Sequence, residues 1–351
     1  MNPKTSVLLL GQFPPDSLIS MARLQEECGY DVFWYADERF FREVYSGLTL
    51  AACNTHRIQL GTMVTDPYTR HPALTAMGIA TIDELSGGRA ILGVGAGISG
   101  FAEMQIERRK PALAMREMVT VIQELLRGGV VDFHGPTVQF AHGRLDFQPV
   151  RGDVPIYVAS NGPLGLELAG EIADGVVMQG VVADRLIDWM LDHVSAGATR
   201  VGRNLPEVDV VARVNVCISD ESKLAKDLMR PSLVRSLFSQ QPKFRTFKAA
   251  GLEVTCHLRE AVASLGYTHD LRVLEPLSAM IPDEFVDALT LAGTVDEVAA
   301  KVVRMITRGV THVAIYPMAA DDDVANTVVR FAREVMPIVR REIGSCGDQA
   351  L

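Results

Sequence analysis

Short apolar runs alternate with longer amphipathic segments along nearly the whole chain. An apolar run of about four to eight residues, bounded by Gly, Pro or polar residues, predicts a strand that is buried on both faces. Longer segments with a period near 3.6 predict helices, such as the one that begins at Pro72 and ends before Gly87. The pattern predicts eight strands: Ser6–Leu10, Val32–Tyr35, Arg57–Val64, Arg89–Val94, Pro155–Ala159, Gly175–Met178, Val208–Ile218 and His312–Tyr316.

Helical material follows each predicted strand, which indicates either an open doubly wound sheet or a closed barrel. The count of eight favours a (β/α)8 TIM barrel. Residues Val130–Val150 alternate in polarity and predict a small hairpin, whereas the segment of about 221–288 is mostly helical and predicts an insertion before the last βα unit. We therefore expect a single barrel domain over residues 1–351, although this length leaves a two-domain arrangement open.

The chain has 351 residues, 48% hydrophobic residues and a net charge of -9. The hydrophobic content is ample for a large core, and the acidic balance gives no electrostatic reason to bind nucleic acid or an anionic membrane. The apolar run near the N-terminus is too short for a signal peptide or a membrane span. The five cysteines form no C-x-x-C pair, which suits free thiols. We expect a soluble, cytoplasmic protein.

Candidate chemistry lies at the strand ends, because the active site of a barrel forms on the βα loops. Asp37 and Glu38 follow the second strand and are suited to acid/base work or to orienting a ligand. Gly61 lies inside the third strand, where glycine indicates a bulge or a close ligand approach. Alternatively, Asp37 and Glu38 lie in a solvated loop, and Gly61 only weakens the strand geometry locally.

The loop after the fourth strand reads G-x-G-x-x-G from Gly95 to Gly100. A dinucleotide fingerprint should open a βαβ unit with an acidic residue about 20 residues on, but a helix occupies that region here. The loop is better explained as backbone that lets a flat ligand or a phosphate approach. Residues Ser160 to Pro163 begin a helix and could bind an anion or simply cap that helix.

Several other kinds of site have no support in the sequence. No His spacing suggests a metal site, so none is expected. There is also no G-x-S-x-G nucleophile elbow and no Walker A loop.

Three stretches of the sequence resemble the bacterial-luciferase-like superfamily, and within it methylenetetrahydromethanopterin reductase and other F420-dependent oxidoreductases. They are Leu60-Gly61-Thr62-Met63-Val64-Thr65-Asp66-Pro67-Tyr68-Thr69-Arg70-His71-Pro72, Ala80-Thr81-Ile82-Asp83-Glu84-Leu85-Ser86-Gly87-Gly88-Arg89 and Leu92-Gly93-Val94-Gly95-Ala96-Gly97. The likeness continues to Glu297 and so spans nearly the whole chain.

The resemblance implies a (β/α)8 barrel that binds deazaflavin coenzyme F420 or FMN and transfers a hydride at the central ring of the cofactor. It also implies a non-prolyl cis peptide at the bulge in the third strand. Asp37 and Glu38 become the candidate catalytic residues, with Glu38 as the acid/base and Asp37 beside the ring. The implied cofactor-binding residues are Asp37, Gly61, Thr62, Met63, Val64, Gly95, Ala96, Gly97, Ser160, Asn161, Gly162, Pro163, Gln179 and Gly180.

Departures from the family pattern concern the substrate side. Glu38 replaces a His of the reductase and of the related sugar-phosphate dehydrogenases, Ile98 replaces an acidic residue, and Gln12 lies where the first strand of the reductase ends in an acid. These changes argue against a pterin or sugar-phosphate substrate. We expect Gln12, Phe40 and Ile98 to contact a less charged organic molecule.

Three functions stay open at this point. The first is an F420-dependent hydride transferase, the second an FMN-dependent monooxygenase on the same barrel, and the third a binding protein without catalysis. The resemblance favours the first, and it implies a homodimer or higher homo-oligomer.

Overall fold

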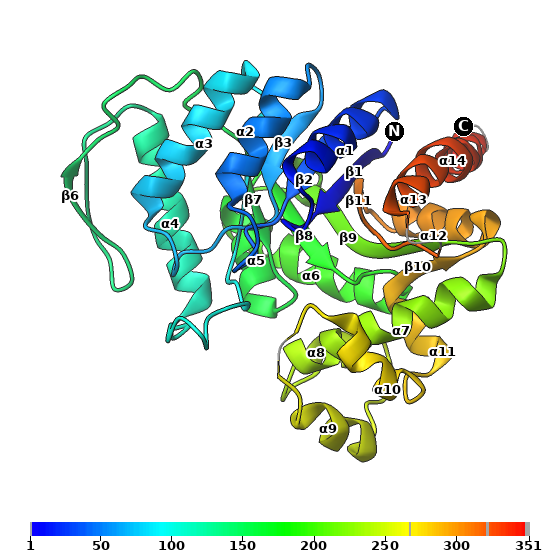
Figure 1. Ribbon diagram of the computed structural model, residues 1–351. Coiled ribbons are helices and arrows are strands. Elements are labelled where there is room, and N and C mark those ends of the chain that lie inside the picture. Colours follow the sequence, from blue (N-terminus) through cyan, green and yellow to red (C-terminus); the bar gives the residue numbers. More distant parts are fainter. Residues whose placement is uncertain (1, 267, 321–322, 348–351) are drawn as a thin grey trace. The chain divides into compact units, whose positions relative to one another are not determined.

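A computed structural model describes residues 2–266, 268–320 and 323–347 of the chain (Figure 1). Its main sheet has the strand order β10-β9-β11-β1-β2-β3-β4-β7-β8, and β9 also pairs with β8. The last pairing closes eight parallel strands into a barrel, so the predicted (β/α)8 fold is confirmed.

All eight predicted strands are present, with ends that shift by up to two residues. The barrel strands are β1 (Lys4–Leu9), β2 (Val32–Tyr35), β3 (Gln59–Thr62), β4 (Ala90–Gly95), β7 (Ile156–Ala159), β8 (Gly175–Gln179), β9 (Asp209–Ile218) and β11 (His312–Pro317). The predicted hairpin is also present, as the antiparallel pair β5 (Val131–His134) and β6 (Gln139–Gly143). The main sheet has one further strand, β10 (Thr290–Gly293), which pairs with the end of β9 and was not predicted.

The chain forms two compact units: residues 6–177 with 193–209, and residues 1–5 with 178–192 and 210–351. In the first, which we call the N-terminal unit, helices α1 to α5 pack against one another in chain order (Figure 1). These helices are α1 (Pro15–Glu27), α2 (Val44–Asn54), α3 (Pro72–Ser86), α4 (Pro111–Leu126) and α5 (Pro163–Ile172). Helix α6 (Asp184–Arg200) begins in one unit and ends in the other, and a 3₁₀ turn follows at Leu205–Glu207.

The second unit, the C-terminal unit, contains the predicted helical insertion. Its helices are α7 (Ser222–Ser239), α8 (Arg245–Ala249), α9 (Cys256–Ala263), α10 (Glu275–Ser278) and α11 (Asp283–Leu289), with a 3₁₀ turn at Leu271–Leu274. Helix α12 (Val295–Thr307) begins with a capping box between Thr294 and Glu297.

The apolar pattern of the sequence predicts one closing helix from Val324 to Ile343. The structure divides it into α13 (Val324–Arg330), a π-helical turn (Phe331–Val335) and α14 (Met336–Gly347). Pro337 at the start of α14 accounts for the wider turn, because proline has no N–H and its ring clashes with the carbonyl four residues earlier.

Aromatic side chains fill part of the barrel interior of the N-terminal unit. The rings of Trp34 and Tyr157 lie 5.6 Å apart. A Cβ on Gly61 would lie 2.2 Å from the Trp34 indole, so packing explains this glycine within β3. The Tyr157 hydroxyl donates to Asp209 at 2.8 Å, and burial together with that carboxylate holds the pKa of Tyr157 well above its ordinary value.

Glu26 at the end of α1 fixes the segment before β3. Its Oε1 accepts backbone N–H groups from His56, Arg57 and Ile58 at 2.8, 2.6 and 3.0 Å. Burial alone would raise the pKa of Glu26, but these hydrogen bonds outweigh it and hold the pKa below its ordinary value of 4.5.

Glu26→Gln is therefore expected to lower the free energy of unfolding by about 1 kcal/mol at pH 7. Because the pKa of the folded state is depressed, the contribution of the carboxylate is present above pH 4.5 and is lost as the pH falls through the folded value. Urea unfolding of both proteins at pH 7 and pH 4 checks this. The difference should shrink at pH 4, and a constant difference would contradict the assignment.

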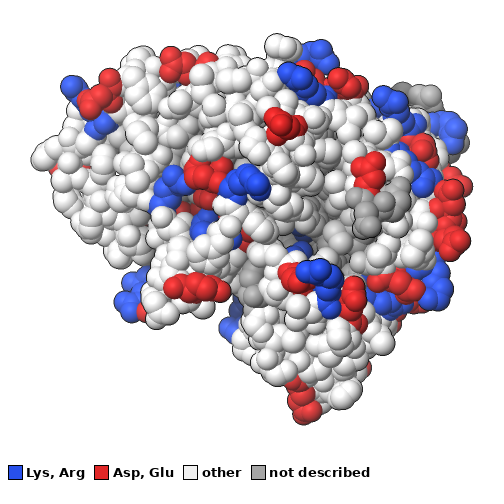
Figure 2. All heavy atoms as spheres, viewed as in Figure 1, with Lys and Arg blue, Asp and Glu red and all other residues white. Residues whose placement is uncertain are grey.

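The apolar content of the helices and the distribution of surface charge bear on possible contacts with membranes and other molecules. No helix in the described part of the chain is long and apolar enough to cross a membrane. On the face drawn in Figure 2, Lys and Arg are interspersed with Asp and Glu, and most of the surface is uncharged.

The sequence predicts free cysteine thiols and no metal site. Four cysteines are free thiols: Cys28, Cys53, Cys217 and Cys256. The side chain of Cys346 lies outside the described residues. Within residues 2–266, 268–320 and 323–347, no group of three or more His, Cys, Asp or Glu side chains is placed to hold a metal ion.

Candidate functional site

The carboxyl ends of β2, β3, β4 and β7 meet in the N-terminal unit. These strands are neighbours in the sheet and run parallel, so the loops after them emerge at one edge. Asp37, Thr65, Gly97 and Ser160 each lie in one of these loops. The predicted cofactor residues of this unit are therefore brought to one end of the barrel.

Strand β3 ends in an irregular segment. The Thr62 hydroxyl donates to Gly93 O at 2.8 Å and accepts from Gly93 N at 2.9 Å, so a side chain replaces backbone partners there. The peptide between Met63 and Val64 is cis and non-prolyl, as the resemblance implied. Backbone pairing with β4 resumes at Thr65, whose N–H donates to Gly93 O and whose carbonyl accepts from Gly95 N.

Small residues beside this segment leave a surface without large side chains. A Cβ on Gly95 would lie 2.5 Å from Val64 Cγ2 and 3.6 Å from Ala159 Cβ, so these three residues are neighbours. A Cβ on Gly97 would lie 3.2 Å from Asp66 Cβ. We call Val64, Gly95 and Ala159 the small-residue floor. Glycine and alanine at two of its positions allow a ligand to approach the backbone closely.

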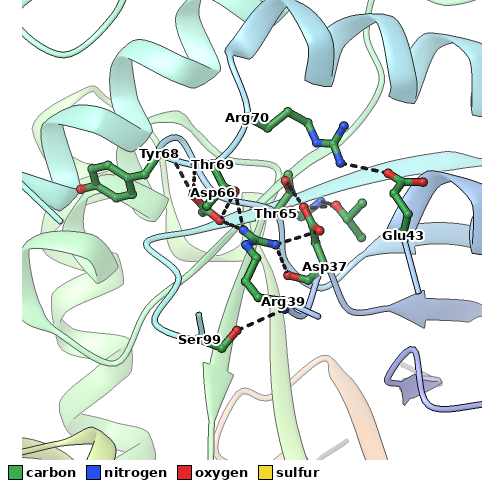
Figure 3. Close-up of polar contacts among 11 residues, drawn as sticks. Asp37, Arg39, Glu43, Thr65, Asp66, Tyr68, Thr69, Arg70 and Ser99 are labelled. Atoms are coloured by element: carbon green, nitrogen blue, oxygen red, sulfur yellow. Dashed lines mark hydrogen bonds and ion pairs between the residues drawn. The ribbon is translucent and has the colours of Figure 1, made fainter. Parts of the chain in front are cut away.

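A polar network lies beside the floor, since its Thr65 directly follows Val64 in the chain, and Figure 3 shows the contacts within this network. The Asp37 carboxylate accepts from the Thr65 hydroxyl at 2.7 Å and pairs with Arg39 Nη1 at 2.8 Å. Arg39 Nη2 pairs with Asp66 and donates to Thr69 Oγ1 at 2.6 Å. The side chains of Asp37 and Arg39 are 10% and 11% exposed, so this ion pair is shielded from solvent far more than a surface pair.

Asp66 shapes the loop after β3. Its Oδ1 accepts the backbone N–H groups of Tyr68 and Thr69 at 2.8 and 2.9 Å, and its Oδ2 accepts from the Thr69 hydroxyl. This is the Asx-type turn expected of an aspartate followed by proline. The loop is thereby fixed beside Arg39.

A second ion pair lies further along the same loop. Arg70 Nη2 lies 2.9 Å from Glu43 Oε1, and its guanidinium lies 4.9 Å from the centre of the Tyr45 ring. Burial alone would raise the pKa of Glu43, but hydrogen bonds from Ser46 outweigh it and hold the pKa below its ordinary value. Glu43 is thus a helix cap for α2.

The loop after β7 leads directly into α5. Ser160 Oγ accepts from Gly162 N at 3.1 Å, and α5 begins at Pro163 with no side-chain cap. A Cβ on Gly165 would lie 2.2 Å from Ser160 Oγ, so this glycine admits the serine. The helix begins where the sequence predicted.

The predicted substrate residues lie on the loops after β1, β2 and β4. The carbonyls of Gly11 and Gln12 accept from Arg42 at 3.1 and 3.0 Å. Phe40 has φ 66° and is 70% exposed, and Ile98 is 39% exposed. Glu38 lies between Asp37 and Arg39 and is half-buried.

Two predicted residues belong to the C-terminal unit. Gln179 ends β8, and Gly180 follows with φ 66° and donates to Arg213 O at 2.9 Å. The turn is formed as expected of a glycine with positive φ. Its place relative to the floor stays a prediction.

Sequence reasoning missed Thr65, Asp66 and Thr69 as members of the network and did not assign Arg39 a partner. The Asp-Pro turn signal at Asp66 was present in the sequence. Asp66 and Arg39 are 27 residues apart in the chain, so their contact could be recognised only in the folded structure.

Comparison with known proteins adds to this geometry. The model of the luciferase-like monooxygenases matches residues 3–312. A 5,10-methylenetetrahydromethanopterin reductase of Methanolobus tindarius is 34% identical over 306 residues, which cover 86% of this chain and 90% of the relative. The 5,10-methylenetetrahydromethanopterin reductase of Archaeoglobus fulgidus is 31% identical, and the match covers 93% of this chain and 98% of the relative. The solved structure of the coenzyme F420 dependent tetrahydromethanopterin reductase from Methanopyrus kandleri matches with a TM-score of 0.85 at 28% identity, covering 96% of this chain and 99% of that one.

Proposed function

The chain belongs to the luciferase-like monooxygenase family, and we propose that it is an oxidoreductase that transfers a hydride between the deazaflavin coenzyme F420 and a small organic substrate. The observation that carries the proposal is the small-residue floor beside a fixed carboxylate, on a chain whose matched relatives include F420-dependent enzymes.

The residues of the site fit a planar cofactor. A Cβ at Gly95 would meet Val64 at 2.5 Å, and one at Gly97 would meet Phe101 at 2.8 Å, so glycine lets these side chains pack closely against the loop. In our proposal Val64 and the backbone of Gly95 to Gly97 support the ring. The other predicted cofactor contacts are Gly61, Thr62 and Met63 for the ring, and Ser160, Asn161, Gly162, Pro163, Gln179 and Gly180 for the phosphate-bearing tail.

F420 supplies a ring carbon that accepts or gives a hydride when it is bound. The barrel orients cofactor and substrate, and such positioning accounts for much of the rate of a reaction of this kind. Asp37, which Thr65 and Arg39 hold in place, is the acceptor that orients the ring. Glu38 takes or returns the proton that accompanies the hydride.

The substrate proposed is a small organic molecule of low charge. Phe40 and Ile98 expose apolar surface at the loops after β2 and β4. Gln12 adds a neutral polar side chain at the loop after β1. Apolar contacts of this kind favour a neutral substrate over an anionic one, because a buried anion without a partner is costly.

The competing function is an FMN-dependent monooxygenase, which the name of the matched family favours. The absorbance spectrum of the protein reconstituted with each cofactor, followed in air after chemical reduction, separates the two. Our proposal expects a bound deazaflavin that absorbs near the violet edge and stays reduced in air. A yellow bound flavin that is rapidly reoxidised would support the monooxygenase instead.

We also propose that residues 1–351 act as one catalytic domain in the cytoplasm and form a homodimer or a higher homo-oligomer. Three large apolar side chains on α3 support self-association, since Leu74, Met77 and Leu85 are each about half exposed and lie near one face of the helix. Light scattering should then give a molar mass of at least twice 38.2 kDa.

A further inference from the structure

Arg39 joins the loops that follow β2, β3 and β4 (Figure 3). Its Nη1 donates to the Asp37 carbonyl at 2.5 Å and lies 2.8 Å from Asp37 Oδ1. Its Nη2 contacts Asp66 Oδ2 and Thr69 Oγ1, and its backbone N–H donates to Ser99 Oγ at 3.4 Å. A single residue therefore holds three loops at the edge of the floor.

We infer that Arg39 is a positioning residue, which fixes the Asp37 carboxylate as an oriented hydrogen-bond acceptor for the cofactor; the inference rests on the proposed function. Arg39 itself is assigned no contact with the cofactor or the substrate. It acts through Asp37.

The geometry of Asp37 supports this role. Thr65 Oγ1 donates to one carboxylate oxygen and Arg39 Nη1 contacts the other, so both oxygens are held and the carboxylate plane cannot turn freely. Each oxygen keeps a further lone pair, whose direction is now fixed. Lysine could not reproduce the arrangement, because its ammonium lacks the planar fork of the guanidinium.

Arg39 also stabilises the fold, through its ion pair with Asp66. The Asp66 side chain is only 1% exposed, and Arg39 is its ion-pair partner. Removal of Arg39 would leave a buried carboxylate without that cation, which destabilises a folded protein. Asp66 contacts the guanidinium at Nη2 and Asp37 contacts it at Nη1. The effect on the fold can therefore be separated from the effect on Asp37 by a second substitution that neutralises Asp66.

Arg39→Met and the double variant Arg39→Met/Asp66→Asn form the test. Asparagine at position 66 keeps an oxygen for the backbone N–H groups of Tyr68 and Thr69 but removes the charge. The melting temperature and the dissociation constant for F420, measured by quenching of its fluorescence, are determined for each protein. The absorbance maximum of the bound cofactor is a further readout of contacts to its ring.

We expect Arg39→Met to melt earlier and to bind F420 at least tenfold more weakly. The double variant should recover the melting temperature, yet keep the weak binding and a displaced absorbance maximum. Recovery of wild-type affinity and absorbance in the double variant would show that Arg39 serves only the fold, and wild-type affinity in Arg39→Met would overturn the inference directly.

Arg70→Met is the matched control, because Arg70 lies on the same loop and pairs with a carboxylate, Glu43, at 2.9 Å. We expect its F420 affinity to stay within twofold of wild type. Cofactor binding by the wild-type protein tests the proposed function separately. If wild type binds FMN and not F420, the proposed function fails and the same variants are titrated with FMN; if it binds neither, both proposals fail.

Discussion

Glu38→Gln is expected to lower the turnover number by roughly 10²- to 10⁴-fold, the usual contribution of a general acid or base. Glutamine keeps the size and a hydrogen-bonding oxygen but cannot carry the proton. In our account the neighbouring Asp37 does not take over, because Thr65 and Arg39 hold its carboxylate and its remaining lone pairs accept from the cofactor ring. Cofactor affinity should stay within about twofold, since Asp37 and the floor are intact. Steady-state kinetics and an F420 titration of the same preparation measure both quantities.

Glu107→Gln is a suitable control for this effect. Glu107 lies on the loop after β4 and pairs with Arg109, and its side chain is 68% exposed. Its loss should leave turnover unchanged. Equal turnover in Glu38→Gln and wild type would remove Glu38 from the mechanism, and equal losses of turnover and affinity would make it a binding residue.

Gly95→Ala is expected to weaken F420 binding at least tenfold. The added Cβ would lie 2.5 Å from Val64 Cγ2, a distance that the two groups cannot keep. Because the Cγ atoms of valine are attached to a β-branched carbon, Val64 has little rotamer freedom and the floor itself must shift. Fluorescence titration measures the loss, and the melting temperature shows how much of it comes from the fold.

Two further variants complete this test. Val64→Ala/Gly95→Ala provides room for the new methyl group and should recover much of the affinity and stability that Gly95→Ala loses. Gly129→Ala is the control, because its nearest neighbour would be Glu124 O at an ordinary 3.5 Å. If Gly95→Ala binds F420 like Gly129→Ala, the floor does not support the ring.

The sequence predicted the barrel well because its strands are apolar on both faces and glycine or proline marks most boundaries. Strand β10 was missed because Thr290-Leu291-Ala292-Gly293 is a short apolar run, and periodicity cannot distinguish such a run from the end of a helix. The π-helical turn at Phe331–Val335 was missed for a related reason, since the helical pattern continues through it.

The candidate site was predictable to the level of its loops. The order of strands identified Asp37, Gly95 and Ser160 as residues at strand ends, and the resemblance assigned them to a cofactor. The contact of Asp37 with Thr65 was not predictable, because it depends on the register between β2 and β3, whereas Arg39 lies on the same loop as Asp37. A one-residue shift of that register would turn such side chains to the opposite face.

The central claim is that the loops after β2, β3 and β4 of the N-terminal unit hold the ring of F420. A crystal structure of the protein with F420 bound tests it most directly. We predict density for the ring against Val64 and the backbone of Gly95 to Gly97, with Asp37 within hydrogen-bond distance of it. Ring density at any other place in the protein would contradict the claim.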